Sequence, residues 1–365
     1  MRWNWQQPDW PNFKYDPAQL KDFEAQFLKK EGMLLGAFQH LSGEDKKTLT
    51  IEIISTEAVK TSEIEGEYLN RESVQSSVRR QFGLHTESRN ILPAEQGIAE
   101  MMMDLYRSYG EPLTESKLFS WHRMVTKGRH DLKDIGRYRT HEDPMQVVSG
   151  YVHKPIVHFE APPSFMMKKE MDRFINWFNN TAPTGGAPLA ALAHAGIAHL
   201  YFVCIHPFED GNGRIGRAIA EKALAQSLGE PTLIALSHRI EKHKKAYYEA
   251  LEKANKFNEV TDWLIYFSKT ILAAQHYTQR YIEFLIDKTR LFDKLRDNLN
   301  NRQNKVLARM FREGPEGFEG GLSAENYISI TKTSRATATR DLHELVEMGA
   351  LSRTGERKHT RYYLS

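Results

Sequence analysis

Apolar residues recur three and four positions apart along most of this chain, the spacing that places them on one face of an α-helix. The pattern is visible in Leu20, Phe23 and Phe27, and again from Leu49 to Ala58. It continues through further runs at 73–82, 94–109, 115–127, 164–180, 188–205, 214–228, 239–254, 261–275 and 276–298. The chain is therefore expected to be mainly α.

One stretch, 136–163, departs from the helical pattern. Its apolar pairs at 147–148 and 156–157 are separated by turn-forming pairs at 149–150 (Ser-Gly) and 154–155 (Lys-Pro). Short apolar runs bounded by glycine and proline are typical of a β-hairpin. We expect a small two-stranded flap here.

The C-terminal part of the chain has its own order of elements. A polar run at 298–303 precedes two short helical patterns, a third helix from Ser334 to Glu347, and alternating residues from Leu351 to Leu364. That order matches a winged helix-turn-helix, with the third helix as the recognition-type helix and the alternating residues as the wing. The expected division is an N-terminal arm with helices at 1–90, a helical core at 91–275, a connecting helix or linker at 276–300, and the winged helix at 301–365.

Composition limits the class of protein without giving a function. With 365 residues, 40% of them hydrophobic and 27% charged, the chain is typical of a soluble protein of two or three domains. Its single cysteine, Cys204, excludes an intrachain disulfide, and no apolar segment of signal-peptide length opens the chain. The stretch Leu189–Ile205 is short for a membrane span and contains two histidines. A cytoplasmic protein without membrane contact is expected.

Two terminal regions bear on partners. The first 16 residues form an aromatic arm, expected to pack on the rest of the chain or on a second copy, so a homodimer is one expectation. The net charge of +3 lies at the other end, because residues 302–365 hold 11 Lys or Arg against 8 Asp or Glu. The basic side chains of the third helix and of the wing would contact DNA phosphates. Asp341, Glu344 and Glu347 dilute the charge of that helix, and protein docking is the other use of a winged helix.

The segment 206–217 gathers groups that triphosphate chemistry needs. Its glycines, Gly211 and Gly213, allow consecutive backbone N–H groups to converge on an anion at the start of a helix. Arg214 and Arg217 follow on that helix, one turn apart and therefore on one face. We interpret the segment as a phosphate-binding loop.

The same segment supplies a carboxylate and a base. Asp210 is suited to a divalent cation, and His206 is suited to take a proton from a hydroxyl near neutral pH. Residues 211–216 (Gly-Asn-Gly-Arg-Ile-Gly) also fit the dinucleotide pattern G-x-G-x-x-G. That fold needs its glycines directly after a strand and alternating strands and helices downstream, whereas residues 206–210 intervene here and a helical pattern follows. The dinucleotide interpretation is the weaker one.

The whole segment resembles the signature of the Fic family, His-x-Phe-x-[Asp/Glu]-Gly-Asn-Gly-Arg-x-x-Arg, and every fixed position is matched. The resemblance extends to the aromatic arm, the flap and the C-terminal winged helix. It implies a Fic-type helical bundle core and transfer of AMP from ATP to a hydroxyl side chain, with release of pyrophosphate. The acceptor would be a Ser, Thr or Tyr of a target protein, self-modification included.

The resemblance also implies roles for single residues. His206 would be the general base and Asp210 would hold Mg²⁺. Tyr248 and Asn255, seven apart and so on one helical face, resemble the family segment beside adenine and ribose. Family members that transfer phosphate carry a larger residue at the position of Gly213, which favours AMP transfer here. The remaining phosphate-binding residues would be Gly211, Asn212, Gly213, Arg214 on the inner phosphates, Gly216, and Arg217 on the γ-phosphate.

A second motif lies far upstream, at 61–66 (Thr-Ser-Glu-Ile-Glu-Gly). By itself it is typical of a charged helix end closed by glycine. It also resembles the inhibitory motif of some Fic proteins, [Ser/Thr]-x-x-x-Glu-[Gly/Asn]. That resemblance implies that Glu65 pairs with Arg217 and inhibits the enzyme. Two other functions stay open: removal of AMP from a modified protein with the help of Glu65, and regulation through DNA binding by the winged helix.

Overall fold

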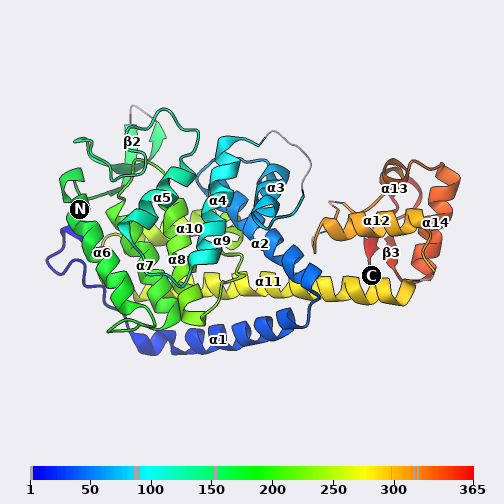
Figure 1. The fold of residues 1–365 in the computed structure, drawn as a ribbon, viewed down its shortest axis with the longest axis horizontal. Helices are drawn as coiled ribbons and strands as arrows, with labels where there is room; N and C mark the ends of the chain where they lie inside the picture. Colours follow the sequence, from blue (N-terminus) through cyan, green and yellow to red (C-terminus); the bar gives the residue numbers. More distant parts are fainter. Residues whose placement is uncertain (1–2, 86–90, 152–153, 297, 316, 319) are drawn as a thin grey trace. The chain divides into compact units, whose positions relative to one another are not determined.

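The computed structural model describes residues 3–85, 91–151, 154–296, 298–315, 317–318 and 320–365, and it is built almost entirely from helices (Figure 1). The helices are α1 (Pro17–Gln39), α2 (Gly43–Ile64), α3 (Arg71–Gln81), α4 (Pro93–Ser108), α5 (Glu115–Val125), α6 (Met167–Thr181), α7 (Ala191–Ile205), α8 (Asn212–Leu228), α9 (Leu236–Lys242), α10 (Lys244–Ala254), α11 (Thr261–Leu295), α12 (Asn301–Arg312), α13 (Ala324–Thr331) and α14 (Arg335–Glu347). The strands are β1 (Gln146–Tyr151), β2 (Lys154–Glu160), β3 (Leu351–Thr354) and β4 (Arg361–Leu364). The mainly α prediction is confirmed.

Two helical predictions need correction. The runs expected at 261–275 and 276–298 form the single helix α11, because no glycine or proline interrupts Thr261–Leu295. The run expected at 239–254 is divided into α9 and α10 at His243, whose backbone (φ −128°, ψ 32°) is not helical. Apolar periodicity continues through both places, so only the backbone distinguishes a joined helix from a broken one.

The chain folds as two compact units, Met1–Gly36 with Lys46–Thr278, and Ala37–Asp45 with Gln279–Ser365. The division falls inside α11, and the expected domain bounds did not place residues 37–45 with the C-terminal part. Among the described residues, no helix has the length and apolar character needed to cross a bilayer.

The first unit is organised around α7. This helix is apolar on all sides, and all but one of its residues are buried, as expected of a helix that other helices surround. Glu24 of α1 closes its N-terminus, since its Oε1 accepts from the backbone N–H groups of Leu192 (2.9 Å) and Ala193 (3.1 Å). The helix α8 packs along α7 (Figure 1), and the segment 206–211 that joins them is therefore anchored at both ends.

The aromatic arm packs on its own chain. The Trp5 indole Nε1 donates to the carbonyl of Glu160 (2.7 Å), and the Trp10 Nε1 donates to Glu170 Oε2 (2.9 Å). Asn4 is fully buried, and its backbone N–H donates to the carbonyl of Asn255 (2.8 Å). The aromatic arm therefore packs on its own chain and gives no support to a dimer. The homodimer stays a prediction.

The flap predicted within 136–163 is present as the antiparallel pair β1–β2, with Gln146 opposite Glu160 and Ser149 opposite Ile156. In the second unit, α12, α13 and α14 are followed by the antiparallel pair β3–β4, in which Leu351 lies opposite Leu364. This is the order of elements expected of a winged helix-turn-helix. A separate apolar core, which includes Val306, Tyr327 and Leu342, holds these elements together.

Candidate active site

The loop between α7 and α8 is shaped by two left-handed residues. His206 ends α7 at φ 52°, and Gly211 opens α8 at φ 82°. Asn212 fixes the loop between them: its side-chain Oδ1 accepts from the N–H of Phe208 (3.0 Å) and its Nδ2 donates to the carbonyl of Phe208 (2.8 Å). The Asn212 side chain therefore fixes the backbone of the loop. Only the backbone N–H of Asn212 is left to contribute to anion binding.

His206 is prepared to accept a proton. Its Nδ1 lies 3.2 Å from the carbonyl of Val203, and because a carbonyl can only accept, this nitrogen carries the hydrogen. The Nε2 is therefore left with its lone pair. Burial lowers the pKa of His206 to about 4, so the ring is neutral at pH 7. A neutral imidazole with an unprotonated Nε2 is the form that a general base requires.

Arg139 holds this histidine in place. Its Nε donates to the carbonyl of His206 (2.9 Å), its Nη2 donates to the carbonyl of Pro162, and its backbone N–H donates to the carbonyl of Pro207 (2.9 Å). The side chain is buried. Sequence reasoning missed Arg139, because nothing in its local sequence indicates that it reaches a loop more than sixty residues away.

Arg217 is occupied by the upstream motif. Its Nη2 lies 2.7 Å from Glu65 Oε1 and donates to the carbonyl of Thr61 (2.7 Å), and its Nε donates to Thr61 Oγ1 (2.8 Å). The guanidinium is only 1% exposed, and its Nη1 has no partner in the described part of the chain. The predicted pair between Glu65 and Arg217 is present in the structure, with one buried donor to spare.

Gly213 reveals where the Glu65 carboxylate lies. A Cβ added to Gly213 would stand 2.0 Å from Glu65 Oε1 and 3.2 Å from Arg217 Nη1. Gly213 belongs to the first turn of α8, whose N–H groups have no partner within the helix. The carboxylate therefore sits directly over the helix start, in the position that a phosphate of a bound nucleotide would take.

Arg214 has a carboxylate of its own. Its Nη1 lies 2.5 Å from Glu67 Oε2 and 3.3 Å from the carbonyl of Val125. The Arg214 side chain is 4% exposed, and its Nε has no partner among the described residues. Sequence reasoning missed Glu67, although it stands only two residues beyond Glu65.

Asp210, the predicted metal ligand, contacts two arginine side chains. One oxygen accepts from the N–H of Gly211 (2.6 Å), Arg129 pairs with the other, and Arg214 Nη2 lies 3.5 Å away. Burial opposes ionisation of the Asp210 carboxyl, but Arg214, Gly211 and Arg129 outweigh it and lower its pKa. In the described ranges, no group of three or more His, Cys, Asp or Glu could enclose a metal. Mg²⁺ in nucleotide sites takes one or two carboxylates and completes its shell with phosphates and water, so this donor set fits a magnesium–nucleotide complex.

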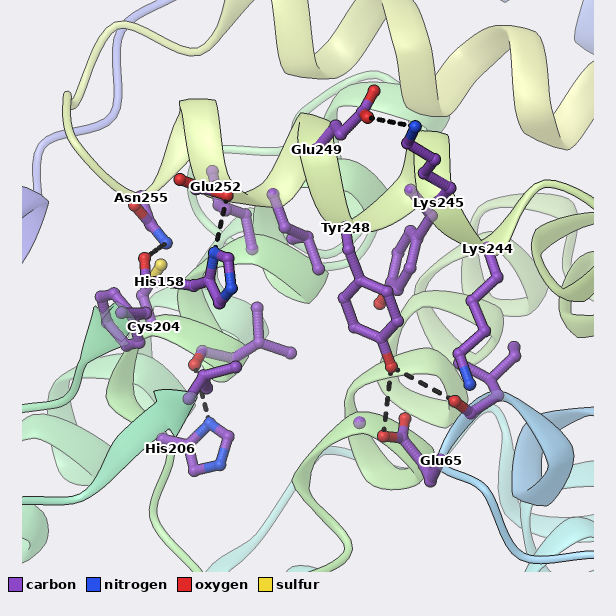
Figure 2. A pocket seen from close by; sticks show the side chains of 18 of the residues that line it. Glu65, His158, Cys204, His206, Lys244, Lys245, Tyr248, Glu249, Glu252 and Asn255 are labelled. Atoms are coloured by element: carbon purple, nitrogen blue, oxygen red, sulfur yellow. Dashed lines mark hydrogen bonds and ion pairs between the residues drawn. The ribbon is translucent and has the colours of Figure 1, made fainter. Parts of the chain in front are cut away.

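A cavity of about 610 Å³ opens beside His206 and Gly213. Figure 2 shows Tyr248 pointing toward Glu65, with His158, Glu252 and Asn255 grouped elsewhere on the wall. The Tyr248 hydroxyl lies 3.3 Å from the carbonyl of Ile64 and 3.5 Å from Glu65 Oε2. This places Tyr248 against the upstream motif, and the position beside adenine and ribose stays a prediction.

Asn255 also lines the cavity, and its position beside adenine or ribose stays a prediction. Its Nδ2 donates to the carbonyl of His158 (3.3 Å), while its buried Oδ1 has no partner in the described part of the chain. Across the same wall, His158 Nδ1 lies 2.9 Å from Glu252 Oε2 and joins β2 to α10.

The structure corrects the assignment of Gly216. This glycine lies inside α8 and faces α7, where an added Cβ would stand 2.9 Å from Val203 Cγ1 and 3.3 Å from His199 Nδ1. It allows the two helices to approach closely. Of the predicted phosphate-binding residues of the loop and α8, only Gly213 is among the described residues that line the cavity. His199 itself is buried, 2.7 Å from the Tyr247 hydroxyl and stacked on Phe267.

Comparisons with known proteins agree with this geometry. Residues 112–224 match the family model "Fic/DOC family", and residues 3–84 match "Domain of unknown function (DUF4172)". The chain is 30% identical over 145 residues to "Protein adenylyltransferase Fic" of Nematostella vectensis, which covers 40% of this chain and 29% of that protein. It is 26% identical over 240 residues to "Protein adenylyltransferase fic-1" of Caenorhabditis elegans, covering 66% of this chain and 41% of that protein. The chain thus spans less than half the length of these curated relatives.

Solved structures share the fold. A Fic family protein from Desulfovibrio desulfuricans superposes with a TM-score of 0.55 at 20% identity, covering 97% of this chain and 98% of that one. The C. elegans Fic-1 structure of residues 134–508 gives a TM-score of 0.51 at 22% identity, covering 74% and 75%.

Proposed function

The chain is a Fic family protein, and from this premise we propose that it transfers AMP from ATP to a hydroxyl side chain of a protein. The acceptor oxygen attacks the α-phosphorus, the bond from that phosphorus to the bridging oxygen breaks, and pyrophosphate leaves. His206 Nε2 takes the hydroxyl proton. The observation that carries the proposal is this neutral histidine beside a helix start lined by two buried arginines.

The nucleotide would lie in the cavity with its phosphates over Gly213. Arg214 and Arg217 would bind the phosphate oxygens, and Asp210 would hold Mg²⁺, which neutralises phosphate charge when bound. Asn255 and Tyr248 line the part of the cavity left for adenosine. The exposed apolar residues of the flap, Val148 and Ile156 among them, would present the target segment by strand addition.

We further propose that the protein inhibits itself through Glu65. The carboxylate occupies Arg217 and covers the helix start. A triphosphate therefore binds productively only after Glu65 moves, and the buried ion pair resists this because separation would leave Arg217 partly desolvated and unpaired. Loss of the carboxylate is expected to activate the enzyme.

The test is transfer of label from α-labelled ATP into proteins of a lysate by the wild type, Glu65→Gly and His206→Ala. We expect weak labelling by the wild type, at least tenfold more by Glu65→Gly, and a loss of about 10²-fold or more when His206→Ala is added to Glu65→Gly. Parallel reactions with γ-labelled ATP separate AMP transfer from phosphate transfer. Equal labelling by the His206 variant would contradict the base assignment, and equal labelling by the wild type and Glu65→Gly would contradict the inhibition.

A removal reaction would give a different product. If Glu65 serves to activate water, the wild type releases free AMP from a pre-labelled target and Glu65→Gly does not. Measuring AMP release from protein labelled by Glu65→Gly distinguishes the two uses of this carboxylate.

A further inference from the structure

The second unit presents a basic helix face that AMP transfer does not use. The exposed residues of α14 follow helical spacing and so share one side of the helix: Arg335, Ala336, Thr339, Arg340, His343 and, at its end, Glu347. The Arg335 and Arg340 side chains are 73% and 66% exposed. The start of the helix is capped by Ser334, whose hydroxyl accepts from the N–H of Thr337 (3.3 Å).

Two of the three acidic residues of α14, Asp341 and Glu344, are turned away from this face, whereas Glu347 is exposed at the end of the helix, 3.4 Å from His343. Asp341 is fully buried, where it accepts from Arg302 Nε (2.7 Å) and from the Tyr327 hydroxyl (2.9 Å). Glu344 accepts from Gln303 Nε2 (2.8 Å), on the side of the helix that faces α12. Both carboxylates therefore hold α14 on its own unit, and the charged groups that the helix presents to solvent are Arg335, Arg340 and, at its end, Glu347.

The hairpin that follows adds further positive charge. Ser352, Arg353 and Thr354 of β3 are exposed, and Arg357 is exposed in the turn. The ion pairs of the helix arginines, Arg335 with Glu325 (3.4 Å) and Arg340 with Glu344 (3.9 Å), are long and solvent-exposed, and such pairs exchange readily for another anion.

We propose that this unit binds double-stranded DNA, with the exposed face of α14 in the major groove and the β3–β4 hairpin against the sugar–phosphate backbone. The charge of the surface favours a polyanion over an acidic or neutral protein. An α-helix of bare, short and basic side chains also fits the width of the major groove. Phosphate contacts would come from the arginines, and Thr339 and His343 would face base edges.

The experiment measures binding of the full chain to a random-sequence 40-base-pair duplex by fluorescence anisotropy, at several salt concentrations. We expect the logarithm of the association constant for DNA to fall linearly with the logarithm of the salt concentration. The steepness of this line should decrease by about one unit for each arginine removed. Arg335→Ala/Arg340→Ala should therefore weaken binding at least about tenfold at low salt.

The matched control is Lys305→Ala/Arg312→Ala, which removes the same charge from α12. Binding by this control close to that of the wild type supports the α14 surface. Equal weakening in both double variants would show that only net charge matters, and it would overturn the proposal. Absence of DNA binding at 50 mM salt would also overturn it and leave protein docking as the use of this unit. Circular dichroism checks that each variant is folded.

The first unit carries a second inference, independent of the first, about the upstream motif. We infer that Glu67 is a second inhibitory carboxylate, acting on Arg214 as Glu65 acts on Arg217. The turn at Gly66 (φ 85°) aims both carboxylates at arginines that lie one helical turn apart. This inference rests on the proposed function, which gives Arg214 the inner phosphates and Arg217 the γ-phosphate.

The two carboxylates should then oppose different nucleotides. Glu67 would weaken binding of ADP and ATP alike, because both have inner phosphates, whereas Glu65 would act chiefly against ATP. Calorimetry of nucleotide binding in a His206→Ala background tests this without turnover. We expect Glu67→Gln to strengthen ADP binding about tenfold, the effect of one charge-assisted hydrogen bond.

Glu63→Gln is the control, because Glu63 lies in the same segment but pairs with Lys60 (2.5 Å) and not with a motif arginine. ADP binding by Glu67→Gln that is no tighter than that of Glu63→Gln would overturn the inference. If Glu65→Gln alone strengthens ATP binding, the proposed function stands and only the role of Glu67 fails. If no variant binds adenine nucleotides, the proposed function fails as well.

Discussion

The two ends of the cavity differ in how their polar groups are employed. At the phosphate end, Arg217 pairs with Glu65, Arg214 with Glu67 and Asp210 with Arg129, and the two motif arginines are buried. At the other end, the charged residues form more exposed pairs, His158 with Glu252 and Lys245 with Glu249.

On the proposed function, the nucleobase end would recognise the nucleotide and the phosphate end would regulate its binding. At the nucleobase end, a ligand would displace no pair that involves a buried arginine. At the phosphate end, the proposed nucleotide binding would require an exchange of partners, in which nucleotide oxygens would replace two carboxylates and a metal ion would take the place of Arg129. Substitutions at the phosphate end should therefore change the rate of AMP transfer and the degree of inhibition. Substitutions at the nucleobase end should change mainly the affinity for the nucleotide.

The largest effect is expected from Arg217→Ala in the Glu65→Gly background. With the Glu65 carboxylate gone, Arg217 keeps its hydrogen bonds to Thr61, and its proposed role at the site is to bind the nucleotide. Its removal should lower kcat/KM for AMP transfer by about 10²-fold or more, the usual cost of losing a donor that stabilises transition-state charge. Arg217→Lys is the control, since it keeps the charge but loses the bidentate fork and should recover only part of the rate. Full activity in Arg217→Ala would remove the distinction between the two ends.

A smaller effect is expected from Gly213→Ala. The added methyl group would stand 2.0 Å from Glu65 Oε1, in the space over the helix start. The single variant should therefore disturb the Glu65–Arg217 pair without becoming active, because the methyl also fills the phosphate position. In the Glu65→Gly background, labelling should fall about tenfold to 10²-fold.

Gly110→Ala serves as the control for this variant, because a Cβ at Gly110 meets nothing within 4 Å. Activation by Gly213→Ala alone would contradict the view that the carboxylate and a phosphate share one position.

The same contrast explains what could be predicted from the sequence. The groups at 206–217 are contiguous, so their residue types and spacing indicate the loop, the helix start and the base directly. Glu65 was found only because a family resemblance supplied its partner, since the periodicity of α2 gives no information about which helix it meets. The pairing of Glu67 with Arg214 depends on the turn at Gly66 and on the packing of α2 against α8, and neither is encoded locally.

Burial is the other property that the sequence hides. Asp341 reads as a surface charge of α14, yet Arg302 and Tyr327 draw it into the core of the second unit. Gly216 completes a glycine pattern in the sequence, yet its position on α8 gives it a packing role. In both cases the residue type suggests one use, and the direction in which the helix presents it decides another.

At the nucleobase end, Asn255→Leu should weaken ATP binding about tenfold. The ratio of AMP labelling between the wild type and Glu65→Gly should stay unchanged. The substitution removes the amide of a residue that lines the cavity, and the loss of one hydrogen bond to a ligand has about this effect. Calorimetry with ATP and GTP is the measurement, and discrimination between the two bases should decline with affinity. A changed activation ratio would mean that the two ends are coupled.

The smallest effect is expected from pH between 6 and 8. Burial lowers the pKa of His206 to about 4, so the base is already unprotonated throughout this range, and kcat/KM of Glu65→Gly should vary by less than about twofold. Below about pH 5 the rate should fall, because a protonated ring cannot accept the hydroxyl proton.

The same shift affects stability, since a histidine whose folded pKa lies below its unfolded value of 6.5 favours unfolding as pH drops from 6.5 toward 4. His122, His194 and His199 have pKa values lowered to about 4 by burial as well, so the melting temperature should decline over the same interval. Activity and melting curves must therefore be recorded together. A rate that halves between pH 7 and pH 6 while the melting temperature holds would show that His206 titrates near its unperturbed pKa and that the phosphate end is more open to water than its paired charges indicate.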